Sequence, residues 1–225
     1  MNPAGWLAAA SLVALGAGLF VVLTEGRFGG RRLVRAVYDV AGPRLFARAS
    51  DAARWRVLAG DIGLHPDARA LDVGCATGDL ALAWASLETF RGVVVGLDRS
   101  GPMLDVAEKL AAERGVARRA RFVEADAAAG LPFPDDSFDV VTCLGLLEVI
   151  RRPGSLASEL ARVLAPGGRL AVSLYRRPPA GVRALDFDGY AAMLRPLGLT
   201  AFEARPCRRH HDVVLASKGS AVSVI

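Results

Sequence analysis

A glycine-bearing turn between an apolar run and a helix-like run carries the strongest chemical signal in this sequence. Residues 71–81 read LDVGCATGDLA, with Asp72 before the turn and Gly74 and Gly78 inside it. Glycine lets the backbone approach a ligand closely, and the start of a helix presents free N–H groups. Open α/β sheets bind ligands at such turns. The spacing departs from the G-x-G-x-x-G fingerprint of nicotinamide dinucleotide enzymes, because Ala76 takes the middle position and no third glycine follows at the required place.

The alternation of short apolar runs with amphipathic stretches predicts the elements that position this turn. We expect strands at residues 70–73, 93–97, 121–123, 138–144, 169–175, 200–204 and 212–216, and helices at residues 79–87, 101–114, 154–164 and 187–197. Such alternation implies a largely parallel sheet covered on both faces. The link at 206–209 is too short for a crossover helix, so the last two strands should be antiparallel. The sequence therefore predicts a doubly wound α/β fold with a mostly parallel seven-stranded sheet and an antiparallel terminal strand, and Asp79 as the N-cap of the first of these helices.

Several motifs together resemble class I S-adenosylmethionine-dependent methyltransferases, in particular the type 11-like subgroup that methylates small molecules and lipids. The family's first motif, an acid followed by G-x-G-x-G, stands here as DVGCATG. The motifs DRSGPML (98–104), LPFPDDSFDVV (131–141) and LARVLAPGGRLAVS (160–173) follow in the family's order. The resemblance covers about residues 36–217 and implies a Rossmann-like fold and S-adenosylmethionine as cofactor. An alanine with positive φ would cost about 1 kcal/mol, so we expect a negative φ at Ala76.

The resemblance also implies which residues hold the cofactor. Asp98 would accept hydrogen bonds from both ribose hydroxyls, since a carboxylate has two oxygens for a vicinal diol. Asp126 would accept from the adenine amino group, and the Ala127 N–H would donate to the ring. Tyr38 would close over the methionine end of the cofactor, or else it would pack its helix against a membrane. The implied cofactor-binding set is Tyr38, Asp72, Gly74, Cys75, Ala76, Gly78, Asp98, Arg99, Met103, Asp126, Ala127 and Cys143.

The segment CLGLLEVIRRP (143–153) should line the methyl-transfer site. Methyl transfer from a sulfonium carbon mostly needs alignment and exclusion of water, and a general base is optional. Glu148 is the titratable side chain inside this motif. It is therefore the candidate catalytic base, and the alternative is that it supports the fold.

Cysteine and histidine positions do not predict a metal site. Cys75, Cys143 and Cys207 lack the spacing of metal ligands, and the first two have the alternative role of small packing residues. His210 and His211 are neighbours in a predicted strand and would point to opposite faces. We expect no metal.

An uncharged apolar run near the N-terminus predicts a single transmembrane anchor. Residues 4–23 hold 20 residues without charge. A helix of that length spans about 30 Å, the thickness of the hydrocarbon core of a bilayer. A cleaved signal peptide and a buried helix are the alternatives, but the run lacks the basic segment of a signal peptide and exceeds its usual length.

The positive charge lies in one region next to this run. Residues 27–56, the basic region, hold eight arginines and two aspartates, whereas residues 57–225 hold 20 basic and 20 acidic residues. Basic residues beside a span stay in the cytoplasm and attract anionic lipids. Neutrality of the remainder argues against nucleic acid as a partner. We expect an anchor (1–25), a basic juxtamembrane helical segment with the cofactor lid (26–60) and a methyltransferase domain (61–225) in the cytoplasm.

These features predict a single-pass membrane enzyme that methylates a lipophilic small molecule of lipid, quinone, isoprenoid or polyketide type at the cytoplasmic membrane face. The alternative is a non-catalytic, membrane-tethered module that binds the cofactor or a partner. O-, N- and C-methylation share this scaffold, so the sequence leaves the methylated atom open.

Overall fold

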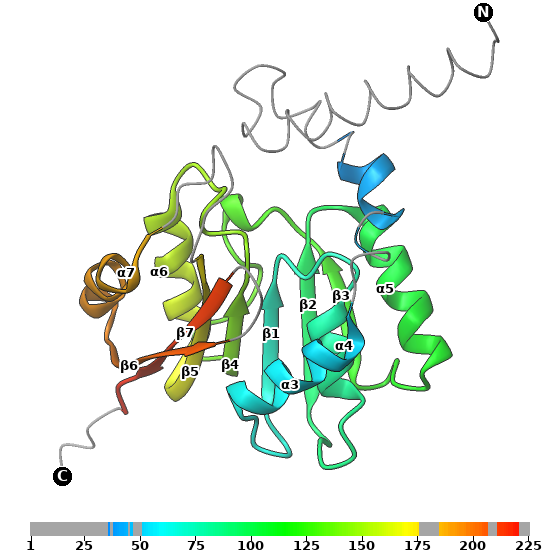
Figure 1. Cartoon of the computed structure of the whole chain (residues 1–225), viewed down its shortest axis with the longest axis horizontal. Helices are drawn as coiled ribbons and strands as arrows, with labels where there is room; N and C mark the ends of the chain where they lie inside the picture. Colours follow the sequence, from blue (N-terminus) through cyan, green and yellow to red (C-terminus); the bar gives the residue numbers. More distant parts are fainter. Residues whose placement is uncertain are drawn as a thin grey trace, which may run out of the picture.

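A seven-stranded sheet forms the framework of the molecule (Figure 1). The computed structural model describes residues 36, 38–44, 46, 51–175, 185–206 and 211–220. The strands are β1 (Arg69–Val73), β2 (Val93–Asp98), β3 (Ala120–Glu124), β4 (Phe138–Cys143), β5 (Leu164–Tyr175), β6 (Leu199–Pro206) and β7 (His211–Lys218). Their order is β3-β2-β1-β4-β5-β7-β6. Neighbouring strands from β3 to β5 are parallel, and β7 runs antiparallel to both β5 and β6. The predicted doubly wound sheet is confirmed.

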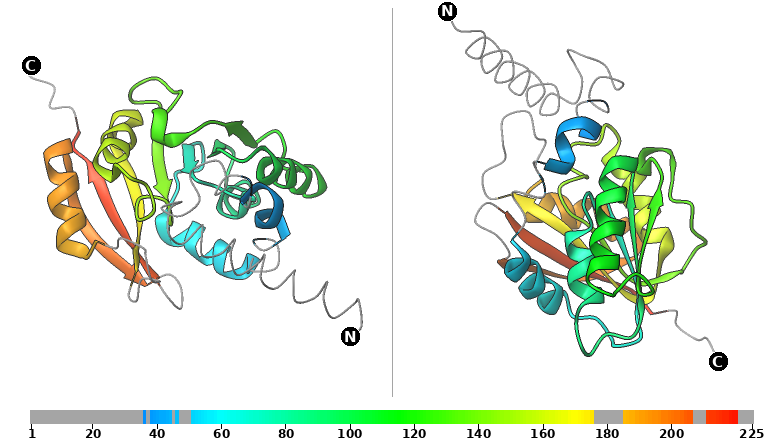
Figure 2. Two further views of the ribbon diagram at one scale, coloured as in Figure 1. Left: turned by 90° about the horizontal axis from the view of Figure 1, so that it is seen from above. Right: turned by 90° about the vertical axis from the view of Figure 1, so that its right-hand side faces the viewer.

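Helices cover both faces of this sheet (Figure 2). They are α3 (Ala52–Ile62), α4 (Asp79–Ala85), α5 (Gly101–Glu113), α6 (Pro153–Val163) and α7 (Phe187–Leu194), with the 3-10 turns η1 (Ala127–Ala129) and η2 (Arg195–Leu197). One apolar layer joins α3 and α4 to the sheet around the fully buried Trp84. The other layer joins α6 and α7 to the opposite face around Leu156 and Leu160. The sheet is therefore buried on both sides, as the alternating pattern predicts.

Two local predictions differ from the structure. Asp79 is not the N-cap of α4. Gly78 occupies that position with a left-handed φ of 76°, and Asp79 is the first residue of the helix. Strand β5 begins at Leu164, before the Pro-Gly-Gly turn, because Leu164 pairs with Phe138. Gly167, with a φ of 77°, lets the chain loop out and rejoin β4 at a shifted register.

Residues 38–44 form a helical segment at the carboxyl ends of β2 and β3, beside α5 (Figure 1). Gly42 packs so closely on Met103 of α5 that a Cβ at Gly42 would clash with the Met103 side chain. The rings of Tyr38 and Phe46 meet edge to face, with centroids 5.8 Å apart. These contacts fix the segment beside the glycine turn.

In the part of the chain that the structure describes, no helix combines the length and the apolar composition needed to cross a bilayer. The predicted anchor at residues 4–23 lies outside that part, as do Cys207, His210 and the first arginines of the basic region. The anchor therefore stays a prediction. The described residues contain no group of three metal-ligating side chains.

Candidate active site

A cavity of about 1290 Å³ opens beside the glycine turn, at the carboxyl ends of the central strands. Nine of the predicted site residues line it: Tyr38, Asp72, Gly74, Cys75, Ala76, Asp98, Arg99, Asp126 and Ala127. The predicted methyl-transfer segment contributes residues 144–146 and 149–152. The topology brings these residues together because β1 and β4 are neighbours at the centre of the sheet, with their connections leaving in opposite directions.

The glycine turn is held by backbone hydrogen bonds to the neighbouring strand. The N–H groups of Gly74 and Cys75 donate to the Leu97 carbonyl oxygen at 2.7 and 3.0 Å. Ala76 has a φ of 49°, so the prediction of a negative φ was wrong. The Ala76 N–H donates to Asp98 Oδ2 at 2.9 Å. This buried hydrogen bond offsets the cost of about 1–2 kcal/mol that a left-handed L residue carries.

The two glycines of the turn serve different purposes. A Cβ built at Gly74 would lie 3.2 Å from Leu146 Cδ2, so the missing side chain lets Leu146 pack closely against the turn. Gly78 is not among the described lining residues. A Cβ at Gly78 would lie 2.8 Å from the Phe122 ring and 2.9 Å from Ala107 Cβ. Gly78 therefore allows the turn to pack tightly against β3 and α5.

Asp98, at the end of β2, presents a carboxylate that is fixed in orientation. Its Oδ1 accepts from the Ser100 N–H at 3.0 Å, and its Oδ2 accepts from Ala76. Burial raises the pKa of Asp98, and these hydrogen bonds oppose the rise. The carboxylate presents two oxygens, the number of acceptors that the two hydroxyls of a ribose diol need.

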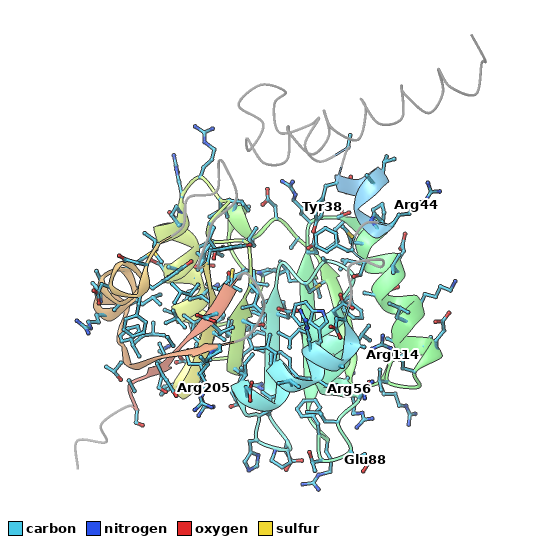
Figure 3. The ribbon with its side chains drawn as sticks, viewed as in Figure 1. Tyr38, Arg44, Arg56, Glu88, Arg114 and Arg205 are labelled. Carbon is cyan, nitrogen blue, oxygen red and sulfur yellow. The ribbon has the colours of Figure 1, made fainter. Side chains whose placement is uncertain are left out.

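Tyr38 lies beside this carboxylate in the cavity lining. Its hydroxyl forms a hydrogen bond with Asp98, and the Arg99 guanidinium lies 5.9 Å from its ring centroid. Figure 3 shows Tyr38 at the inner side of its helical segment, with Arg44 pointing outward. Burial raises the pKa of Tyr38. The segment is held there by packing on α5, and the contact of Tyr38 with the methionine end of the cofactor stays a prediction.

Asp72, at the end of β1, is the second buried acid of the cavity. Its Oδ1 accepts a hydrogen bond from the Thr142 hydroxyl at 2.7 Å. Burial raises the pKa of Asp72 to about 7, the hydrogen bond from Thr142 opposes the rise, and the nearby Asp98 carboxylate adds to it. Asp72 thus titrates near neutral pH next to the turn.

Asp126 and the residues after it form the third edge of the polar side. The Asp126 carboxylate caps η1 by accepting from the Ala128 N–H at 3.0 Å. The cavity lining continues through Ala129 to Gly130. This carboxylate and the adjacent Ala127 backbone agree in type with the acceptor and donor that an adenine needs.

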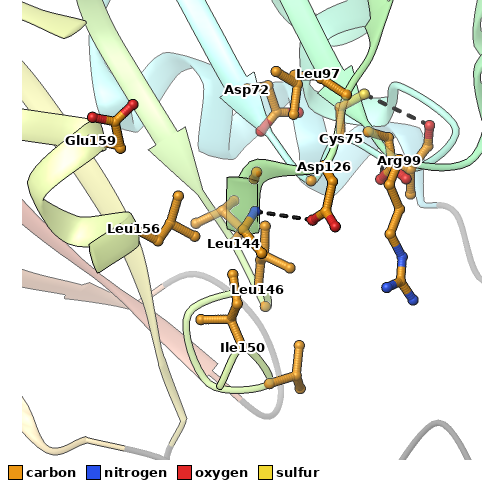
Figure 4. A pocket seen from close by; sticks show the side chains of 18 of the residues that line it. Asp72, Cys75, Leu97, Arg99, Asp126, Leu144, Leu146, Ile150, Leu156 and Glu159 are labelled. Atoms are coloured by element: carbon orange, nitrogen blue, oxygen red, sulfur yellow. Dashed lines mark hydrogen bonds between the residues drawn. The ribbon is translucent and has the colours of Figure 1, made fainter. Parts of the chain in front are cut away.

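An apolar part of the cavity lining lies next to these polar residues. Leu144, Leu146, Val149 and Ile150 from the loop after β4 line it, together with Leu156 of α6. Figure 4 shows Leu144, Leu146 and Ile150 grouped beside Asp126. Sequence reasoning found this loop but missed the lining residues Phe46, Trp55, Leu156, Glu159 and Tyr175. Of these five residues, only Tyr175 could have been predicted from the sequence, because it ends a predicted strand and the neighbouring strands also end at the cavity.

Three predicted residues turn away from the cavity. Met103 packs under Gly42, and Cys143 is fully buried within β4. Glu148 is 2% exposed, and its Oε1 accepts from Ser173 and Tyr190 in the core. None of the three is among the described residues that line the cavity. Glu148 therefore lies in the core behind the described lining of the cavity, and its role as a catalytic base stays a prediction.

The polar side fits the cofactor that the resemblance implies. Asp98 offers two fixed carboxylate oxygens for a ribose diol, and Asp126 and Ala127 offer an acceptor and a donor for adenine. The buried Cys75 lines the same side, and burial raises the pKa of its thiol, so it stays neutral.

Comparisons with known proteins agree with this geometry. The sequence pattern of the family described as "Methyltransferase domain" matches residues 71–172. The demethylmenaquinone methyltransferase of Thermus thermophilus is 42% identical over 161 residues, which cover 71% of this chain and 70% of that protein. The ubiquinone/menaquinone biosynthesis C-methyltransferase UbiE of Azotobacter vinelandii is 41% identical over 136 residues, which cover 60% of this chain and 53% of that protein. The chain thus spans about half the length of its UbiE relatives.

Solved structures show the same fold at lower identity. The [4+2]-cyclase SpnF superimposes with a TM-score of 0.71 at 22% identity, over 84% of this chain and 97% of that one. A SAM-dependent methyltransferase from Aquifex aeolicus gives a TM-score of 0.66 at 18% identity, over 78% and 97%. The chain belongs to the class I S-adenosylmethionine-dependent methyltransferases. S-adenosylmethionine is the cofactor of this class.

Proposed function

We propose that this protein transfers a methyl group from S-adenosylmethionine to a ring carbon of a quinone-type lipophilic molecule. The observation that supports the proposal most is the mixed lining of one cavity, in which Asp72, Asp98 and Asp126 are combined with the apolar loop after β4. Its volume of about 1290 Å³ exceeds the roughly 300–1,000 Å³ of a site for one small ligand. The names of the relatives in Thermus and Azotobacter supply the quinone class.

The residues would perform this chemistry mainly by holding the cofactor and the acceptor in place and by excluding water from the cavity. The cofactor supplies an electrophilic methyl group on a sulfonium sulfur. Asp98 and Asp126 would hold its nucleoside, and Gly74 would let its reacting end approach the apolar wall. Leu144, Leu146 and Ile150 would place a flat apolar ring on the other side and exclude water. The S–CH3 bond breaks as the new C–CH3 bond forms, and the thioether that leaves is neutral, so the reaction needs no acid. The acceptor would react as its quinol, and the proton of the methylated ring carbon would pass to water at the cavity mouth as the ring becomes aromatic again.

The direct experiment uses the purified full chain, methyl-labelled S-adenosylmethionine and a total lipid extract. Label in the quinone fraction after reduction of the extract is the expected result. Label confined to protein or nucleic acid would contradict the proposal. Calorimetry with the cofactor alone tests the alternative of a non-catalytic module, because an absence of binding would favour that module.

We further propose that the chain acts at the cytoplasmic face of a membrane through a single-pass anchor. Support comes from the uncharged run at residues 4–23 and from the eight arginines of the basic region that follows. A lipophilic acceptor dissolved in the bilayer would then be close to the cavity. Extraction of membranes with alkaline carbonate should leave the full chain in the pellet, and release into the supernatant would contradict the anchor.

A further inference from the structure

A cluster of three buried polar side chains lies behind the apolar loop of the cavity. Ser173 Oγ donates to Glu148 Oε1 at 2.5 Å, and the Tyr190 hydroxyl donates to the same oxygen at 2.9 Å. The Gly145 N–H donates to Ser173 Oγ at 2.7 Å. A backbone N–H can only donate, so the Ser173 oxygen accepts from Gly145 and its own hydrogen is free for Glu148. Ser173 and Tyr190 therefore both donate to the same oxygen of Glu148.

This cluster attaches the loop of residues 144–150 to elements that are distant in sequence. Ser173 lies in β5 and Tyr190 in α7, and both side chains are 1% exposed. The loop is held at Gly145 and again at Glu148, on either side of Leu146. The two attachment points turn Glu148 inward and leave Leu146 facing the cavity.

Leu146 links the cluster to the cofactor side. Its Cδ2 lies 3.2 Å from the position that a Cβ on Gly74 would take, so the side chain sits directly over the glycine turn. A shift of the loop would therefore change both the apolar wall and the gap between that wall and the turn. A displacement of about 1 Å in such a gap can reduce the rate of transfer about a hundredfold.

The carboxylate at the centre of the cluster depends on its donors. Glu148 Oε2 accepts no hydrogen bond from the described part of the chain, so Oε1 carries all of the polar contacts found there. Burial raises the pKa of Glu148, and the hydrogen bond from Ser173 opposes the rise. Loss of either donor would leave a buried polar group less satisfied, which favours movement of the loop toward water.

We propose that Glu148 is a positioning residue for the acceptor: through Ser173 and Tyr190 it holds residues 144–150 in the shape that receives the lipophilic ring. The proposal rests on the proposed function for the identity of that ring. Its structural part, that these hydrogen bonds hold the loop in place, does not depend on which substrate is methylated. The two parts are tested separately.

Hydrogen–deuterium exchange on the full chain tests the fixing of the loop. In Ser173→Ala and in Tyr190→Phe, amides of residues 144–150 should exchange about tenfold faster, while those of β1 and β2 keep their rates. Ser137→Ala is the matched control, because its hydroxyl bonds only to carbonyl oxygens of its own turn. An unchanged loop, or faster exchange spread evenly over the sheet, would overturn the proposal.

Kinetics test the effect on the acceptor, with reduced demethylmenaquinone as the probe. Ser173→Ala and Tyr190→Phe should raise the KM for this quinol about tenfold, with the cofactor Kd within twofold of the parent. Glu148→Gln, which keeps an acceptor oxygen, should be milder than Glu148→Ala. A hundredfold lower kcat in Glu148→Gln at unchanged KM, with loss of one limb of the pH profile, would instead make Glu148 a proton-transfer group. If no variant or parent methylates the quinol, the proposed substrate fails, while the exchange experiment still decides the role of Glu148.

Discussion

Ala76 shows how a single residue can carry a conformational cost for the sake of one contact. Its left-handed backbone aims the N–H at Asp98, and this hydrogen bond fixes the carboxylate predicted to bind ribose. Glycine would adopt the same backbone without the steric cost of a Cβ. Ala76 therefore makes the backbone contact with Asp98 that the turn needs, although glycine would make the folded protein more stable at this position.

Replacement of Ala76 by glycine should increase stability. The strain of about 1–2 kcal/mol disappears and the added flexibility of the unfolded chain removes part of the gain, so we expect about 0.5–1 kcal/mol. Urea denaturation measures it. The control Ala112→Gly, at an exposed site within α5, should lose about 1 kcal/mol. Equal losses in both variants would show that the turn carries no strain at Ala76.

Asp98→Asn should weaken cofactor binding without unfolding the protein. A hydrogen bond to a charged group contributes about 1.5–3 kcal/mol, so removal of the charge should raise the Kd about tenfold to a hundredfold. Isothermal titration calorimetry measures the Kd. Asp105→Asn, an exposed carboxylate on α5, should leave it unchanged. An unaltered Kd in Asp98→Asn would remove Asp98 from the cofactor site.

Asp72 should make the stability of the ligand-free protein fall as pH rises. Its pKa is about 7 in the folded protein and near 3.8 in the unfolded chain. Between these values the folded state keeps a proton that the unfolded state has lost, so the free energy of unfolding decreases with increasing pH. The stability of Asp72→Asn relative to the parent should therefore rise from pH 5 to pH 8, by about 1.4 kcal/mol for each unit of pKa shift expressed. A difference that stays constant with pH would mean that Asp72 is ionised throughout.

Among the local structures of the site, the glycine turn is especially tightly packed, because side chains contact it on two sides. Phe122 of β3 and Ala107 of α5 approach Gly78 closely, and Leu146 covers Gly74. The turn therefore has little room to shift, and the N-terminus of α4 is held in one place relative to β2.

Gly78→Ala should destabilise the protein more than backbone conformation alone explains. A Cβ would meet Phe122 and Ala107 at less than 3.0 Å and would also occupy a left-handed backbone, so we expect a loss of about 2–4 kcal/mol. Gly115→Ala is the matched control, since Gly115 has a φ of 68° with no atom within 4 Å of the added Cβ, and should lose about 1–2 kcal/mol. Thermal and urea unfolding compare the two. A loss no larger than that of Gly115→Ala would show that the packing around the turn yields easily.

Sequence patterns predict these elements well where the information is local. The glycine turn, the acid at the end of β2 and the order of the strands all follow from short stretches of sequence. The failures involve partners that are distant in sequence. The φ of Ala76 depends on Asp98, 22 residues away, and the inward direction of Glu148 depends on Ser173 and Tyr190, which are 25 and 42 residues away. The position of the segment 38–44 likewise depends on the packing of Gly42 against Met103, which periodicity in that segment does not reveal.

At the scale of the whole molecule, the charge distribution sets the proposed orientation. The net charge of +5 comes from the basic region, because residues 57–225 are neutral. Replacement of Arg27, Arg31, Arg32 and Arg35 by glutamine should remove the positive-inside bias and produce a mixture of orientations. Protease digestion of intact spheroplasts measures this, since only outward-facing domains are cleaved. Replacement of Arg114 and Arg118 should have no such effect, and a uniform orientation after loss of the four arginines would contradict the proposed topology.

Because β1 and β4 are neighbours in the sheet, the cavity is lined by two separate stretches of the sequence. The described lining residues lie either at or before position 130, which includes the predicted cofactor-binding residues, or at or after position 144, which includes the apolar loop, with none between these positions. A recombination between related genes with its junction at residues 131–143 would therefore exchange the acceptor wall as one block and inherit the cofactor wall unchanged. New acceptor preferences could arise in this lineage through a single genetic event, with the ancestral methyl donor retained.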